Sequence, residues 1–254
     1  MVHFVVTGFS TFLGVSDNPT ERLVEMLEQR GAESPDLILS TAVLEVAAQP
    51  AKEWLAQVYA SPELAAAAAE GPVVLLHLGV DVSGCGFKLE RQAVNEATFC
   101  CPDQRGWRPQ GQLIDDRPGC TLSTHLQTDL DVGQLAAQLA GRQRHNAAVS
   151  LDAGRFVCNY TYYLSLLHSE AARQRCGAPL HSLFVHVPPA TVISLEQQFA
   201  FLLDVLEAVA AALAPAVQAA AGGTEAAAQV APRAAVARAD ALAEGVAVAA
   251  GAPA

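Results

Sequence analysis

The sequence predicts an α/β domain, a three-layer αβα sandwich around a mostly parallel twisted sheet. Short, nearly continuous apolar runs, typical of strands buried on both faces, alternate with helical segments. Strands that alternate with helices form a largely parallel sheet that helices cover on both faces. A chain of 254 residues is also long enough to bury a sizeable core.

Five apolar runs are the expected strands: "HFVVTG" (3–8), "LILSTAVLEV" (37–46), "VVLLHLGV" (73–80), "AAVSL" (147–151) and "SLFVHVP" (182–188). The expected helices span 19–30, 51–60, 131–140, 157–174 and 194–213. Asn18 followed by Pro19 is typical of a helix start, because asparagine caps the first turn and proline suits its first position. Residues 98–128 interrupt the alternation and are expected to form a hairpin or a long excursion.

The composition changes near Pro215, where an alanine-rich tail begins. From there to the end, 19 of 40 residues are alanine and none is aromatic. A helix without large apolar residues has little surface to bury. We therefore expect one domain over residues 1–214 and a tail over 215–254 that is disordered or only partly helical.

Charge and cysteine content narrow the class of protein. A net charge of −11 argues against nucleic acid or an anionic membrane as partner, since both require a basic face. The apolar stretch 199–217 carries Asp204 and Glu207, which indicates a packed helix rather than a membrane span. Six cysteines without a leader pattern indicate reduced thiols in a cytosolic protein. No metal-ligand spacing such as CxxC or HExxH occurs, so no metal is expected.

The stretch "SLDAGRFVCNYTYYL" (150–164) contains the candidate nucleophile. Cys158 follows an Ala-Gly turn and lies at the expected start of a helix, whose dipole favours a thiolate. His186, at the end of the last strand, is a candidate general base and acid, and Glu90 is the carboxylate best placed to orient it. Alternatives remain for each: a buried thiol, a core histidine, an exposed Glu90–Arg91 ion pair, and Cys85 as a rival nucleophile.

Four blocks in order resemble the pyroglutamyl-peptidase I (pyrrolidone-carboxylate peptidase) family of cysteine peptidases. They are "VVTGFSTFLGVSDNPT", the glutamate block "ERQAVNEA", the cysteine block "VSLDAGRFVCN" and the histidine block "FVHVP". The longer segments "GVSDNPTE" and "AVNEATFCCPD…GWRPQ" look like the plant-type branch. Lys88, Gln92 and Leu13 depart from the bacterial-type pattern.

The resemblance implies an α/β peptidase without a cofactor that removes N-terminal pyroglutamate from peptides. It implies Cys158 as nucleophile, His186 as general base and acid, Glu90 as the orienting residue and Arg91 as a supporting residue. It assigns the substrate walls to Phe9 and Phe12, with Asn18 beside them. A homo-oligomer in the cytosol is also implied. Two other functions stay open: a degenerate protein that binds a pyroglutamyl ligand without turnover, and a hydrolase of another small amide.

Overall fold

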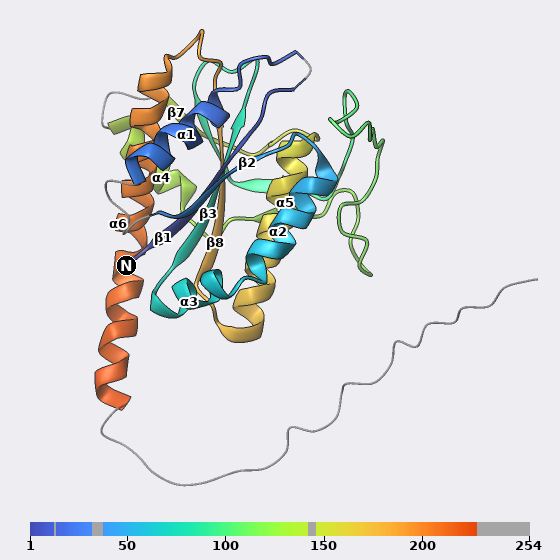
Figure 1. Cartoon of the computed structure of the whole chain (residues 1–254). Helices are drawn as coiled ribbons and strands as arrows, with labels where there is room; N and C mark the ends of the chain where they lie inside the picture. The colour runs from blue at the N-terminus through green and yellow to red at the C-terminus, as the bar shows by residue number, and fades with distance from the viewer. Residues whose placement is uncertain (13, 32–37, 142–145, 228–254) are drawn as a thin grey trace, which may run out of the picture.

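The computed structural model describes residues 1–12, 14–31, 38–141 and 146–227, which form three layers (Figure 1). The elements in chain order are β1 (His3–Phe9), α1 (Pro19–Gly31), β2 (Ile38–Leu44), α2 (Ala48–Tyr59), α3 (Pro62–Glu70), β3 (Val73–Val80), β4 (Phe87–Glu90), β5 (Gln92–Val94), β6 (His125–Gln127), α4 (Val132–Gly141), β7 (Ala147–Ser150), α5 (Val157–Cys176), β8 (Leu180–Val187) and α6 (Leu195–Ala227). Helices α1, α4 and α6 cover one face of the central sheet, and α2, α3 and α5 cover the other. The predicted three-layer α/β architecture is confirmed.

The central sheet has six strands in the order β2-β1-β3-β8-β4-β7. Strands β2, β1, β3 and β8 are mutually parallel. Strand β4 pairs with β8 in the antiparallel sense and with β7 in the parallel sense, so β4 and β7 run against the other four. The sheet is therefore mostly parallel, as predicted, with one reversal of direction that the sequence did not predict.

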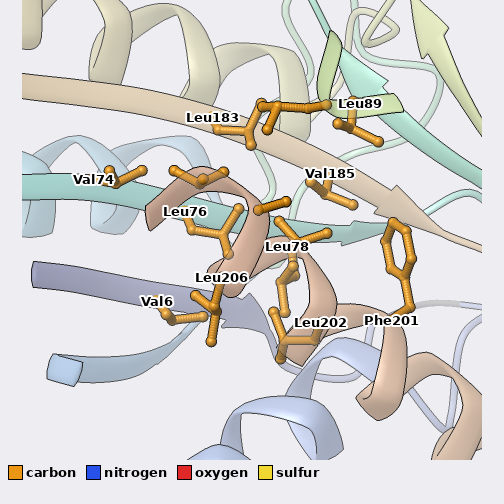
Figure 2. Close-up of a cluster of buried hydrophobic side chains, with 14 of the residues drawn as sticks. Val6, Val74, Leu76, Leu78, Leu89, Leu183, Val185, Phe201, Leu202 and Leu206 are labelled. Carbon is orange, nitrogen blue, oxygen red and sulfur yellow. The ribbon is translucent and has the colours of Figure 1, made fainter. Parts of the chain in front are cut away.

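The face under α1, α4 and α6 holds the first of two apolar clusters (Figure 2). Alternate strand residues point into it, because successive side chains of a strand lie on opposite faces. Figure 2 shows Phe201, Leu202 and Leu206 of α6 meeting strand residues that include Val6, Leu76, Leu78 and Val185. The opposite cluster, under α2, α3 and α5, includes Leu55, Leu64, Tyr162 and Phe184.

Helix α6 belongs to this core although its composition would suit a membrane. Its segment Leu195–Ala214 is long and apolar enough to span a bilayer, with a mean hydropathy of 1.4. However, Phe201, Val205 and Val209 are each 1% exposed and pack against the sheet. The helix continues past Pro215 to Ala227, further than predicted, and the rest of the expected tail (228–254) lies outside the described residues.

Several short elements were missed by the sequence prediction. Strands β4, β5 and β6 have only three or four residues each, too few to show a period. Helix α3 has the alanine-rich sequence "PELAAAAAE", and its N-cap Ser61 accepts a hydrogen bond from the Leu64 N–H. Strands β5 and β6 pair with each other at the base of residues 95–124, so the interrupted region is a long excursion from the domain.

A buried polar network crosses the layer between α5 and the sheet. His77 of β3 is fully buried, with Nδ1 2.8 Å from the Thr7 hydroxyl and Nε2 2.8 Å from the Ser165 hydroxyl. Ser182 donates to the same Ser165 oxygen, and the Tyr59 hydroxyl lies 3.1 Å from it. Each of these polar groups thus has a partner, which a buried polar group requires. Burial lowers the pKa of His77 to about 3.

We expect His77 to make the fold less stable in acid. Its unfolded pKa is near 6.5, so between pH 6.5 and about 3 the unfolded chain binds the extra proton. Stability therefore falls as the pH falls through this window. Urea unfolding from pH 7 to 4 should show the advantage of the wild type over His77→Asn shrinking by ~1.4 kcal/mol per pH unit below 6.5. A difference that stays constant with pH would contradict a neutral buried His77.

Candidate active site

One cavity, of about 590 Å³, gathers the candidate residues at the carboxyl ends of β1, β3 and β8. This is the edge where ligands bind in open α/β sheets. Six predicted site residues line it: Phe9, Phe12, Asn18, Glu90, Cys158 and His186. Phe9, Glu90 and His186 belong to β1, β4 and β8. Phe12 and Asn18 lie in the loop after β1, and Cys158 lies in the first turn of α5. The lining is mainly apolar, with a few polar groups that converge on one region, as in sites for small ligands.

His186 and Glu90 form a buried hydrogen-bonded pair. In the antiparallel pairing of β4 with β8, Lys88 lies opposite His186 and Glu90 opposite Phe184. Glu90 and His186 are thus diagonal neighbours on the same face, within reach of each other. His186 Nδ1 lies 2.8 Å from Glu90 Oε1, and Glu90 is fully buried. Because β4 runs against β8, its carboxyl end points inward and buries Glu90 beneath His186.

The pair favours the protonated imidazole. Burial alone would lower the pKa of His186, but hydrogen bonds and charge interactions with Cys158 and Glu90 raise that pKa to about 10. Since Nδ1 faces Glu90, Nε2 is the ring nitrogen left to interact with Cys158. An imidazolium beside a cysteine favours the thiolate, which is the nucleophilic form.

Helix α5 positions Cys158 at its first turn. Phe156 is the N-cap residue, and its side chain supplies no acceptor for the N–H groups of that turn. These N–H groups and the helix dipole form an electropositive site beside the partly exposed Cys158 thiol. Asn159, the next residue, holds the helix start in place: its side chain exchanges hydrogen bonds of 2.9 Å with both backbone groups of Val94.

Gly79 makes room for the cysteine sulfur. It pairs with His186 across β3 and β8 and therefore shares its face of the sheet. A Cβ atom at this position would lie 2.7 Å from the Phe184 ring and 3.0 Å from Cys158 Sγ. The ring centre of Phe184 lies 4.9 Å from that of His186. The absence of a side chain at residue 79 thus lets the sulfur and the aromatic ring occupy the space beside the imidazole.

The first loop supplies the predicted wall residues. Phe9, at the end of β1, is 3% exposed and belongs to the core as well as to the cavity wall. Phe12 is partly exposed, with its ring centre 6.2 Å from that of Phe156. Asn18 caps α1: its Oδ1 accepts from the Thr20 N–H, and its Nδ2 donates to the Ser10 carbonyl. Its hydrogen bonds therefore support the loop that carries the two phenylalanines.

Arg91 lies apart from the cavity. It follows Glu90 directly, so its side chain points to the other face, where a Cβ at Gly133 would lie 3.6 Å from its guanidinium. The alternative of an exposed Glu90–Arg91 ion pair is therefore wrong, because Glu90 is buried against His186. Cys85, the rival nucleophile, is exposed and is also outside the cavity lining.

Other lining residues were missed by the sequence analysis. Val46 and Phe156 add apolar wall, and Asp81 and Lys88 add an ion pair at the rim. Burial alone would raise the pKa of Asp81, but hydrogen bonds from Lys88 and Ser83 keep this pKa below its usual value. The sequence could have indicated Phe156 as a wall residue, because it lies two residues before Cys158 in the cysteine block.

In the described part of the chain, no three His, Cys, Asp or Glu side chains are grouped to hold a metal ion.

Comparison with known proteins identifies the family. A family model described as pyroglutamyl peptidase matches residues 2–222. The chain belongs to the pyroglutamyl peptidase family. The pyrrolidone-carboxylate peptidase of Pyrococcus furiosus is 31% identical over 185 residues, 72% of this chain and 79% of that protein. Human pyroglutamyl-peptidase 1 is 26% identical over 197 residues, 73% of this chain and 78% of that protein.

Solved structures of the pyroglutamyl peptidase family share the fold. A variant pyrrolidone carboxyl peptidase from P. furiosus matches with a TM-score of 0.68 and 27% identity, over 82% of this chain and 97% of that one. The pyrrolidone carboxyl peptidase from Thermus thermophilus matches with a TM-score of 0.63 and 28% identity, over 81% and 99%. The chain is thus a hydrolase of this family, with a single α/β domain.

Substitution of Gly79 should impair chemistry more than folding. In Gly79→Ala the new methyl group displaces Cys158 Sγ or the Phe184 ring, and a misplacement of about 1 Å at a reacting atom costs on the order of 10²-fold in rate. We expect kcat to fall by that order, with a loss of roughly 1–3 kcal/mol in stability. Gly141→Ala is the matched control, because no atom lies within 4 Å of its added Cβ. Unchanged kcat in Gly79→Ala would show that the sulfur position tolerates the methyl group.

Proposed function

We propose that Cys158, His186 and Glu90 form a catalytic triad that removes the N-terminal pyroglutamyl residue from peptides. The observation that carries the proposal is the buried His186–Glu90 hydrogen bond beside Cys158, within one mainly apolar cavity. Nucleophile, base and orienting carboxylate are the parts that acyl transfer requires. Membership of the pyroglutamyl peptidase family supports the substrate class.

The first half of the reaction forms a thioester. The Cys158 thiolate attacks the pyroglutamyl carbonyl carbon, and the N–H groups at the start of α5 stabilise the charge that develops on the carbonyl oxygen. His186 then gives its proton to the leaving nitrogen, the C–N bond breaks, and the shortened peptide departs as an amine. Glu90 holds the imidazole ring through Nδ1 and stabilises its charged form.

The second half hydrolyses the thioester. His186, now neutral, accepts a proton from water, and the resulting hydroxide equivalent attacks the thioester carbonyl. The C–S bond breaks, pyroglutamate leaves, and the thiolate–imidazolium pair is restored. Every proton transfer passes through Nε2 of His186, because Nδ1 is occupied by Glu90.

The walls of the cavity suit a small flat lactam. The pyroglutamyl ring has apolar faces, which match Phe9, Phe12, Val46 and Phe156, and polar edges that need a few positioned groups. The Lys88–Asp81 ion pair lies in the same cavity, with Lys88 directly opposite His186 in the sheet register. The leaving amine receives its proton from His186, so the leaving residue passes close to this pair.

The cytosol is the compartment that fits the cysteine chemistry. All six cysteines are free thiols, and three of them line the cavity. A reducing compartment keeps such thiols in the form that the reaction needs. The net charge of −11 supports a peptide substrate over nucleic acid.

Removal of the nucleophile should abolish turnover. We expect Cys158→Ser to lower kcat for a pyroglutamyl-fluorophore amide by roughly 10⁶-fold, because members of a triad act as a unit. The melting temperature should stay near that of the wild type, and iodoacetamide should label Cys158 fastest among the six cysteines. Cys176→Ser, at the far end of the same helix, is the matched control and should keep full activity. Turnover in Cys158→Ser close to that of the wild type would refute the assignment, and absent turnover in the wild type would favour a degenerate binding protein.

The cavity should distinguish the lactam from proline. A prolyl amide has the ring but lacks the lactam carbonyl, and a site built to bind that carbonyl rejects such a substrate by roughly 10⁴-fold. We expect that ratio in kcat/KM for matched pyroglutamyl and prolyl amides. Phe12→Ala should raise KM for the lactam, whereas Val192→Ala, at an exposed apolar residue outside the cavity, should not. Equal rates on the two amides would indicate a hydrolase of another small amide.

A further inference from the structure

Two adjacent cysteines line the cavity that holds Cys158. Cys100 and Cys101 lie in the long excursion between β5 and β6, and both belong to the cavity wall. Their Sγ atoms are 3.9 Å apart. Cys100 is exposed and Cys101 is partly exposed, so both thiols can meet a small solute. The reaction proposed above uses neither of them.

The segment that carries this pair is tied to the walls of the cavity. Gln104, three residues after Cys101, donates from Nε2 to the Thr11 carbonyl at 2.8 Å. Its Oε1 accepts from the Val46 N–H at 2.7 Å, and its own N–H donates to the Val46 carbonyl at 3.0 Å. Thr11 precedes the wall residue Phe12, and Val46 is itself part of the wall. A change of backbone at residues 100–101 is therefore transmitted to the substrate walls.

The two thiols differ in a way that suits sequential oxidation. Cys100 is the more exposed and meets an oxidant first. Burial and the neighbouring Cys100 raise the pKa of Cys101, so Cys101 stays protonated and reacts slowly with the oxidant itself. A disulfide between adjacent residues is strained, because their Cα atoms are about 3.8 Å apart whereas ordinary disulfides need about 4.4–6.8 Å. Strained disulfides are readily reduced and are the regulatory kind.

We propose that Cys100 and Cys101 are a redox-active dithiol that hydroperoxides convert to a vicinal disulfide. The Cys100 sulfur attacks the peroxide oxygen, the O–O bond breaks, and a sulfenic acid forms with release of water or an alcohol. The Cys101 sulfur then attacks the Cys100 sulfur, the S–S bond forms, the S–O bond breaks, and a second water leaves. Two thiols have lost two electrons, and the peroxide has gained them.

The effect on catalysis rests on the proposed function. Forming the eight-membered ring changes the backbone at residues 100–101 and, through Gln104, shifts the walls near Phe12 and Val46. The His186–Glu90 pair lies on the sheet and is held independently of this segment. Oxidation of the pair should therefore raise KM more than it lowers kcat.

Peptide mass spectrometry tests the modification without any activity measurement. The full chain and its Cys158→Ser variant are treated with one equivalent of hydrogen peroxide, alkylated and digested with trypsin. The peptide 92–105, "QAVNEATFCCPDQR", contains both cysteines, and Cys158 lies in a different peptide, 156–173. We expect peptide 92–105 to be two hydrogen atoms lighter and unalkylated, and to regain both thiols with glutathione. Full alkylation of both cysteines, or a disulfide that joins this peptide to 156–173, overturns the proposal.

Kinetics test the consequence. After peroxide, KM of the wild type should rise roughly tenfold, which is the low end of what one altered apolar contact costs in a specificity pocket, and glutathione should reverse the rise. Cys176→Ser should respond in the same way. Cys100→Ser and Cys101→Ser, each compared with its own untreated form, should lose the reversible rise. An unchanged KM in the oxidised wild type overturns the regulatory role, whereas absent turnover in the reduced protein contradicts the proposed function and leaves the mass result to decide the dithiol.

Discussion

The hydrogen bond between Glu90 and His186 depends on the single reversal of strand direction in the sheet. If β4 ran parallel to β8, its carboxyl end would lie at the rim of the cavity, where water would solvate Glu90. Because β4 runs the other way, Glu90 lies two register positions further in and is fully buried under the imidazole. A buried carboxylate stays charged only with a partner. Glu90 therefore depends on its hydrogen bond with His186, and the same contact helps to raise the pKa of that histidine. Both follow from the direction of β4.

The buried Glu90–His186 pair also explains why α5 makes hydrogen bonds to the ends of the neighbouring strands β4 and β5. Glu90 Oε2 has no hydrogen-bond partner among the described residues, so the bond from His186 to Oε1 is the one that orients this buried carboxyl group. The end of β4 must therefore be fixed, and the Tyr162 hydroxyl of α5 donates to the Glu90 main-chain oxygen at 2.8 Å. Asn159, on the same helix, holds Val94 of the following strand. Helix α5 thus locates both Cys158, the proposed nucleophile, and the backbone that presents Glu90.

The sequence predicted the fold well where segments are long and apolar. All five expected strands and all five expected helices occur. The apolar runs of β1, β3 and β8 reflect burial on both faces, whereas β2 and β7 are edge strands and are less buried. The sequence prediction missed β4, whose four residues are too short for any period, and with it the reversal of direction. Arg91, expected as a supporting residue, directly follows β4 and lies outside the cavity lining, because consecutive side chains along an extended chain face opposite ways.

The site was predictable only where its residues occur in recognisable blocks. Cys158, His186, Glu90, Phe9, Phe12 and Asn18 all line one cavity, although their separations in sequence carry no information about distance. Cys100 and Cys101 gave no such signal, because their place in the lining of the same cavity depends on the path of a long excursion. That excursion is held by side-chain bonds such as those of Gln104 rather than by an apolar period. The part of the molecule that sequence patterns describe least well is therefore also the part that connects Cys100 and Cys101 with Thr11 and Val46 at the cavity wall.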